Sequence, residues 1–90
     1  MDVREFDGIA REIFAPAYMA IAKRIIEKTG ITEGVCLDVG AGGGYLGIAI
    51  ACITSLDVFL LDNSRGMLDI ALRNIIEGDL GKRVRILLRQ

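Results

Sequence analysis

The sequence predicts an α/β fold, in which a parallel sheet carries flanking helices in the chain order α-α-β-α-β-α-β. A short apolar run at 35–39 breaks into a glycine-rich loop and resumes as an apolar segment of helical length. Two more apolar runs, 56–61 and 84–88, are separated by a segment of helical periodicity. Strands that alternate with helices form parallel sheets with right-handed connections.

Length and composition fit a small, well-buried domain of this class. Residues 1–90 are expected to form a single domain, with 1–30 as a helical cover and 35–90 as a βαβαβ core. A hydrophobic content of 52% excludes a disordered chain. The net charge of −1 argues against nucleic acid as a partner. A local basic cluster is interpreted as a solvated strand end, and it consists of Lys82, Arg83, Arg85 and Arg89.

The chain contains two cysteines and no histidine. Cys36 falls in the first expected strand and Cys52 on the following apolar helix, so both are interpreted as small core hydrophobes. Without a CxxC pair or a histidine, neither a metal site nor a Cys/His nucleophile is expected. The longest apolar run, 48–53, is too short to span a bilayer, and the first residues do not resemble a signal peptide. We therefore predict a cytoplasmic protein without a membrane segment.

Two amphipathic helices are expected before the first strand. Apolar residues recur at helical spacing over 2–14 and again over 17–29, with charged residues between them. Pro16 either breaks the first helix or starts the second, and Gly30 is a natural end of the second. In one interpretation both helices cover one face of the sheet. In the other, the first helix is a lid over a bound cofactor.

The pattern of the core elements predicts how each is buried. The strand at 35–39 does not alternate, which is typical of a parallel strand buried on both faces. The helix at 45–54 is apolar nearly all round, so we expect the sheet to cover one side and the N-terminal helices the other. After the second strand, Ser64 is expected to cap a helix at 65–77 that Gly78 ends.

The glycine-rich loop after the first strand is the predicted site. Four glycines lie within positions 40–44, and glycine is needed where the backbone takes positive φ or approaches a ligand closely. A helix that begins directly after such a loop aims free N–H groups at an anionic group. We therefore expect a nucleotide-like cofactor at this loop.

Two acidic residues lie at the carboxyl ends of the first two strands, where open parallel sheets bind ligands. Asp62 closes the second strand, and its carboxylate can accept hydrogen bonds from both hydroxyls of a ribose. The alternative role for Asp62 is to cap the helix that follows. Asp38 precedes the loop, and it either binds the cofactor or braces the loop through nearby backbone N–H groups.

These two stretches resemble the motifs of a known family. Residues 37–44, LDVGAGGG, are similar to the first motif of the class I S-adenosylmethionine-dependent methyltransferases, an acid followed by Gly-x-Gly-x-Gly. Residues 58–64, VFLLDNS, with Met67 and Leu68 after them, resemble that family's second strand, its ribose-binding acid and the next helix. The resemblance covers essentially the whole chain, and it implies a Rossmann-like fold that is truncated relative to the family's seven strands.

The resemblance implies methyl transfer to a small molecule, with S-adenosyl-L-methionine as cofactor and S-adenosyl-L-homocysteine as its product. Asp38 is then expected at the amino group of the methionine part, and Asp62 at the ribose hydroxyls. Asn63 and Met67 are expected beside the adenine, and Tyr18 over the methionine end. The backbone that should surround the methionine part belongs to Gly40, Ala41, Gly42 and Gly44. No catalytic residue is implied, and the strands that usually carry substrate are not in this chain.

Other interpretations stay open. Residues 42–47 also satisfy Gly-x-Gly-x-x-Gly, and Asp62 follows about 20 residues later, as an NAD or FAD site requires. Against this, an acid at Asp38 lies unfavourably beside a pyrophosphate. A third interpretation is a non-catalytic nucleotide-binding remnant or partner subunit. In every case the strand at 35–39 is expected to be an apolar edge, which a missing C-terminal half or a partner chain would cover.

Overall fold

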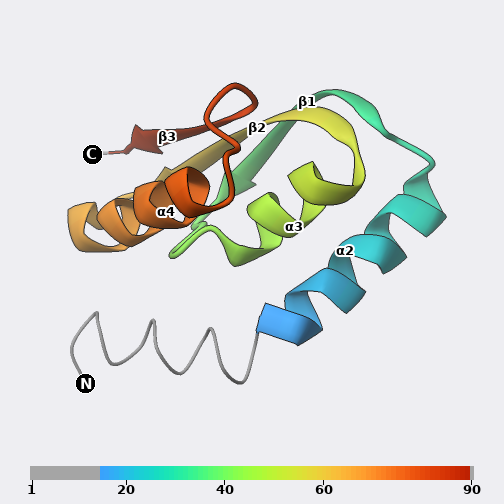
Figure 1. Cartoon of the computed structure of the whole chain (residues 1–90), viewed down its shortest axis with the longest axis horizontal. Coiled ribbons are helices and arrows are strands. Elements are labelled where there is room, and N and C mark those ends of the chain that lie inside the picture. The colour runs from blue at the N-terminus through green and yellow to red at the C-terminus, as the bar shows by residue number, and fades with distance from the viewer. Residues whose placement is uncertain (1–14, 90) are drawn as a thin grey trace.

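The computed structural model describes residues 15–89, which form a three-stranded sheet with helices packed against it (Figure 1). The elements in chain order are α2 (Ala15–Thr29), β1 (Glu33–Val39), α3 (Tyr45–Ile53), β2 (Ser55–Asp62), α4 (Arg65–Glu77) and β3 (Val84–Leu88). The helix predicted at 2–14 lies outside the described residues. The other predicted elements are all present, with ends displaced by two residues or fewer. Over 15–89, no helix is long and apolar enough to cross a membrane.

The three strands run parallel, in the spatial order β1-β2-β3. Leu37 and Val39 of β1 lie beside Phe59 and Leu61 of β2, and Leu61 lies beside Leu87 of β3. β1 and β2 are each followed by a helix that returns the chain to the end of the sheet where the strand began, as parallel pairing requires. The predicted α/β class with a parallel sheet is confirmed.

The helix ends follow the predicted capping residues. Gly30 ends α2 with a φ of 68°, and its N–H donates to the carbonyl of Ile26 at 2.8 Å. Ser64 caps α4, because its hydroxyl accepts the backbone N–H of Met67 at 3.2 Å. Gly78 ends α4 as expected.

The described helices form a layer on one face of the sheet. α3 packs against β2, α4 packs against β2 and β3, and α2 packs on the outer side of α3 (Figure 1). This arrangement explains why α3 is apolar nearly all round, since the sheet and α2 cover opposite sides of it, as predicted. The buried core between these layers includes Ala22, Ala49, Ile50, Ala51, Leu56, Val58, Leu60, Ala71, Ile75 and Val84.

Gly47 brings α3 close to the sheet. A Cβ at this position would overlap the side chain of Leu60 and would lie 3.1 Å from Cγ1 of Val58. A side chain of any size would therefore push α3 away from β2 and open the core that both elements share. The position of this glycine sets the distance between helix and sheet directly beside the predicted site.

The opposite face of the sheet is uncovered in the described part of the chain. Val35, Leu37 and Val39 of β1 are 68%, 59% and 62% exposed. Phe59 and Leu61 lie on the same face, because register partners in adjacent strands point to the same side. The prediction that β1 is buried on both faces is therefore wrong for these residues. The apolar side chains of β1 lie on the uncovered face, whereas Cys36 and Asp38 alternate with them on the face toward the helical layer.

Two other sequence interpretations need correction. Arg83, assigned to a solvated basic cluster, donates from its guanidinium to the carbonyls of Ala51, Thr54 and Leu56 at 3.0–3.2 Å. It thereby joins the C-terminal end of α3 to the start of β2, where helix carbonyls lack partners within the helix. Cys52, interpreted as a core hydrophobe, is exposed on α3, and Cys36 is half-buried. A helix packed between two layers still has an outward edge, and Cys52 lies on it.

Candidate functional site

The glycine loop is fastened to the end of β2. The N–H groups of Gly40 and Ala41 both donate to the carbonyl of Leu61, at 2.8 and 2.9 Å, and the N–H of Gly44 closes a turn onto Ala41 at 3.0 Å. Gly40, Gly42 and Gly44 take φ values of 74°, 57° and 80°, which other residues rarely adopt. The glycines at these three positions therefore meet a backbone requirement, as the sequence predicted.

Asp62 connects the loop to the start of α4. One carboxylate oxygen accepts the N–H of Gly42 at 2.8 Å, and the other accepts the N–H of Ser64 at 2.8 Å. The capping role was the alternative to ligand binding, and the structure shows Ser64 as the cap of α4, with Asp62 holding the backbone N–H of that cap residue. Each carboxylate oxygen has a further lone-pair site, so both oxygens can also accept a hydroxyl from a ligand. The two roles are compatible.

The hydrogen bonds of the loop limit what its own backbone can offer a ligand. The N–H groups of Gly40, Ala41, Gly42 and Gly44 all donate to protein acceptors, whereas the prediction of free N–H groups concerned the first turn of α3 and stays a prediction. Two carboxylates, Asp38 and Asp62, lie beside the loop in addition. These carboxylates suit hydroxyl donors and cationic groups better than a phosphate, although Arg89 lines the same cavity as Asp62.

Asp38 is half-buried at the end of β1, close to the first turn of α3. Burial raises the pKa of its carboxyl, and the charge of Asp62 acts in the same direction, whereas a hydrogen bond from the Gly47 backbone N–H opposes them. A half-buried carboxylate at the end of a parallel strand is suited to bind a cationic group of a ligand. The same carboxyl is the second cause, after burial, of the raised pKa of Cys36.

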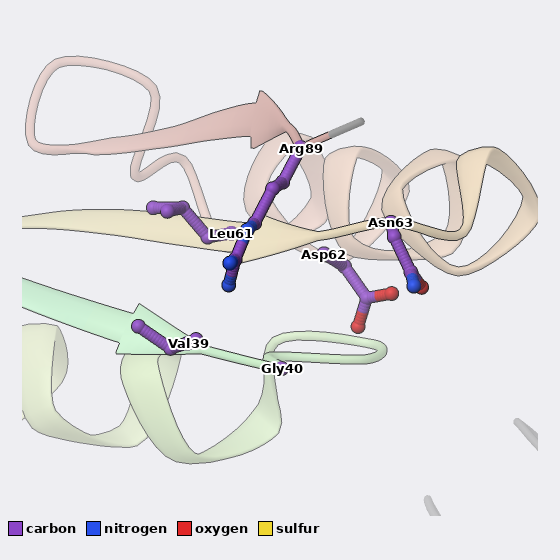
Figure 2. Close-up of a pocket in the computed structure, with 6 residues that line it drawn as sticks. All are labelled: Val39, Gly40, Leu61, Asp62, Asn63 and Arg89. Atoms are coloured by element: carbon purple, nitrogen blue, oxygen red, sulfur yellow. The ribbon is translucent and has the colours of Figure 1, made fainter.

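Two cavities lie on either side of the glycine loop, and Gly40 lines both. The smaller, about 260 Å³, is lined by Tyr18, Asp38, Gly40, Ala41, Gly42, Gly43, Tyr45, Leu46 and Met67. The larger, about 460 Å³, is lined by Val39, Gly40, Leu61, Asp62, Asn63 and Arg89 (Figure 2). Every predicted site residue except Gly44 lines one of these cavities. Gly44 is buried below the loop, where a Cβ would lie 2.7 Å from Leu60 and 3.3 Å from Ala71.

The cavities divide the predicted residues in a way the sequence did not indicate. Asn63 and Met67 were expected together, yet Asn63 lines the larger cavity and Met67 the smaller. Figure 2 shows the side chain of Arg89 reaching from the end of β3 across Leu61 toward β1. Arg89 is exposed, as expected of a solvated strand end, and it also lines the larger cavity, which the sequence did not indicate. The parallel register places the carboxyl ends of β1, β2 and β3 at the same edge of the sheet, and this is why Arg89 lies near Asp62 and Val39.

Tyr45 and Asn74 were also missed. Tyr45 begins α3, and its ring stacks on that of Tyr18 while lying against Gly43. The side-chain amide of Asn74 on α4 donates to the carbonyl of Gly43 at 3.0 Å. Both contacts join the loop to other elements, and no local sequence pattern marks either of them. Within the described residues, no group of three or more His, Cys, Asp or Glu is placed to hold a metal ion.

Comparison with known proteins gives structural relatives. No family model and no curated protein matches the sequence. A protein from Methanococcus maripaludis, provisionally assigned as an S-adenosyl-L-methionine-dependent methyltransferase, is 40% identical over 98% of this chain, with a TM-score of 0.94. This chain spans 40% of the length of that relative.

Two more distant structures agree with this likeness at the level of the fold. Coclaurine N-methyltransferase, solved with N-methylheliamine and S-adenosylhomocysteine, has a TM-score of 0.72 and 24% identity over 82% of this chain and 22% of its own. The glycopeptide N-methyltransferase MtfA, solved with S-adenosyl-L-methionine, has a TM-score of 0.70 and 22% identity over 80% of this chain and 32% of its own. The predicted resemblance is confirmed: this chain has the Rossmann-like fold of part of an S-adenosylmethionine-dependent methyltransferase.

Proposed function

We propose that this chain is the cofactor-binding part of an S-adenosylmethionine-dependent methyltransferase that acts on a small molecule. The observation that carries the proposal is the position of Asp62, at the end of β2 and fixed to Gly42 and Ser64 with acceptor capacity remaining on both oxygens. The relative that is 40% identical over nearly the whole chain supports the same class.

The two cavities suit the two ends of this cofactor. The ribose hydroxyls would donate to Asp62, with the adenine beside Asn63 in the larger cavity. The methionine part would occupy the smaller cavity, with its amino group at Asp38 and Tyr18 over it. Met67 lines the smaller cavity, so we assign it to the methionine end in place of the adenine. S-adenosylmethionine carries positive charge on its sulfonium and its amino group, which the carboxylates of Asp38 and Asp62 favour.

The hydrogen bonds of the loop favour this cofactor over a dinucleotide. A pyrophosphate is bound by loop and helix N–H groups that point at the ligand. Here four loop N–H groups are already donated to Leu61, Asp62 and Ala41. A pyrophosphate would also approach Asp38 and Asp62, whose charges would repel it. The NAD or FAD alternative is therefore the weaker proposal.

Methyl transfer from a sulfonium requires little acid–base catalysis by the protein. The bound sulfonium supplies an activated methyl group, and the protein aligns it with the acceptor. Asp62 and the loop would fix the position of the ribose, and Asp38 would orient the methionine end. We assign no catalytic base to this chain.

The uncovered sheet face suggests what else the enzyme needs. β1 is an edge strand in the described sheet, and its outward face carries exposed Val35, Leu37 and Val39. An exposed apolar edge strand promotes association. We propose that further strands and helices, in the same polypeptide or in a partner chain, cover this face in the active protein. The M. maripaludis relative, of which this chain spans 40%, has enough additional length to do so.

Calorimetric titration tests the cofactor. S-adenosylhomocysteine and NAD would be titrated separately into the purified protein, the Asp62→Ala variant and the Asp69→Ala variant. Asp69 is an exposed acid on α4 that pairs with Arg65, so its replacement is a matched control. We expect S-adenosylhomocysteine alone to bind, with binding lost in Asp62→Ala and retained in Asp69→Ala. Binding of NAD alone would overturn the proposal, and S-adenosylhomocysteine binding without methyl transfer to any acceptor would favour the non-catalytic alternative.

A further inference from the structure

We propose that Asn74 is a positioning residue that holds the glycine loop in its cofactor-binding conformation, an inference that rests on the proposed function. Asn74 lies in the third turn of α4, far along the chain from the loop. Its side-chain amide nevertheless donates to the carbonyl of Gly43 at 3.0 Å, in a partly buried contact. The contact joins α4 to the segment between β1 and α3 that lines the smaller cavity.

The peptide unit between Gly43 and Gly44 is the group that Asn74 restrains. Its carbonyl, from Gly43, accepts the Asn74 amide, and its N–H, from Gly44, donates to Ala41 at 3.0 Å. The two ends of one peptide plane are therefore each held by a hydrogen bond. A flip of this plane would break both bonds together, because the carbonyl and the N–H rotate as one rigid unit.

Glycine on both sides makes such a flip sterically accessible. Neither Gly43 nor Gly44 has a Cβ to restrict rotation, and Gly44 already takes a φ of 80°. The conformation of this unit therefore depends on its hydrogen bonds more than on its own steric limits. Gly43 is buried, so removing the Asn74 amide would leave a carbonyl without that donor in a place that water reaches poorly.

The loop conformation matters for the cofactor because neighbouring bonds depend on it. The backbone N–H of Gly42, the residue that precedes Gly43, donates to the Asp62 carboxylate at 2.8 Å. A loop that samples a second conformation would present Asp62 and the smaller cavity correctly for only part of the time. Affinity falls in proportion to the competent fraction. Loss of one buried hydrogen bond corresponds to a change of about tenfold in such an equilibrium.

The test compares Asn74→Ala with Thr54→Ala. Thr54 also bonds the backbone through its side chain, at the far end of α3, donating to Ile50 at 2.7 Å and accepting from Leu56 at 3.2 Å. Both variants remove side chain–backbone hydrogen bonds, but Thr54 lines neither cavity of the site. Two quantities are measured for each: hydrogen exchange of the Gly42 and Gly44 amides without ligand, and the dissociation constant for S-adenosylhomocysteine.

We expect Asn74→Ala to accelerate exchange of the two amides by about fivefold or more and to weaken binding by at most about tenfold, because affinity follows the competent fraction of the loop. Thr54→Ala should change neither, although it lowers stability. Unchanged exchange in Asn74→Ala would overturn the inference, whatever the ligand does. If the unaltered protein does not bind S-adenosylhomocysteine, the proposed function fails, while the exchange comparison still decides the role of Asn74. Should Asn74→Ala not fold, Asn74→Asp keeps the size of the side chain, removes the donor and gives the same comparison.

Discussion

The rings of Tyr18 and Tyr45 stack with their centroids 5.9 Å apart and their planes inclined by 10°. Tyr18 belongs to α2 and Tyr45 begins α3, and both line the smaller cavity beside the glycine loop. The Tyr45 ring also lies against Gly43, where an added Cβ would come within 2.7 Å of it. The helix before the first strand therefore contributes a side chain to the site, in addition to covering α3.

Replacement of Tyr18 should weaken cofactor binding. Tyr18→Ala removes a ring that lines the smaller cavity and also the stacking that holds Tyr45 beside it, which contributes about 0.5–1.5 kcal/mol. We therefore expect the dissociation constant for S-adenosylhomocysteine to rise by at most about tenfold. Tyr18→Phe keeps the ring and should bind normally. Calorimetry on the two variants measures the difference. Unchanged binding in Tyr18→Ala would mean that α2 is cover alone.

Replacement of Asp38 by Asn should raise the stability of the protein at neutral pH and lower its affinity for the cofactor. Burial raises the pKa of this carboxyl above its usual 3.8, so the folded state binds the proton more tightly than the unfolded state does. Stability therefore falls as pH rises from the unfolded pKa through the folded pKa, and the loss persists at neutral pH. Asp38→Asn removes this loss and keeps an acceptor for the Gly47 N–H.

We expect Asp38→Asn to melt higher than the unaltered protein at about pH 7 and at nearly the same temperature at about pH 3, where both forms of the protein are uncharged at this position. Its affinity for S-adenosylhomocysteine should fall because the amino group loses a charged partner. Thermal unfolding across pH measures the first effect and calorimetry the second. A variant that is less stable at neutral pH would contradict the account of the raised pKa.

Gly47 should not tolerate a side chain. Gly47→Ala places a Cβ into Leu60 and close to Val58, and overpacking of this kind costs about 1–3 kcal/mol. Gly81→Ala is the matched control, because a Cβ there meets nothing within 4 Å and its φ is not positive. Urea unfolding should show the loss for position 47 alone. Equal stability of the two variants would argue that α3 can move away from β2 without cost.

Arg83 should stabilise the fold although it belongs to a charged cluster. Arg83→Ala removes hydrogen bonds to three backbone carbonyls, and since one bond of this kind to a charged group contributes about 1.5–3 kcal/mol, we expect a loss of at least about 2 kcal/mol in the free energy of unfolding. Arg85→Ala, at an exposed neighbouring position, should change the free energy of unfolding by less than about 0.5 kcal/mol. Chemical denaturation distinguishes them. A loss of less than about 0.5 kcal/mol in both variants would show that water satisfies the three carbonyls as well as Arg83 does.

The two cysteines should differ in reactivity. Cys52 is exposed, whereas Cys36 is half-buried and burial raises the pKa of its thiol, which lowers the thiolate fraction that reacts. Iodoacetamide should therefore label Cys52 first, and mass spectrometry of digested protein follows both sites. Preferential labelling of Cys36 would mean that β1 is more accessible than the structure indicates. Denatured protein, in which both thiols react alike, is the control.

The sequence by itself determined the order of elements, the caps and the position of the glycine loop. These depend on local chemistry: apolar periodicity, the side-chain acceptor of Ser64 and the positive φ that Gly40, Gly42 and Gly44 adopt. Asp38 and Asp62 were also identified, because a residue at the end of a parallel strand lies at the ligand-binding edge wherever the strand is placed in the sheet.

Only the tertiary structure decided which apolar surfaces are covered and which groups meet. An apolar strand has the same sequence whether one or two layers cover it, so the exposed face of β1 had no local signal. Arg83 and Asn74 are polar residues of ordinary appearance, and each acts on carbonyls about thirty residues away along the chain. The N–H groups of Gly40, Ala41 and Gly42 donate to Leu61 and Asp62 of β2, because parallel pairing brings the end of that strand against the loop. Hydrogen bonds between distant segments depend on packing, and packing is the part of this protein that its local sequence patterns leave open.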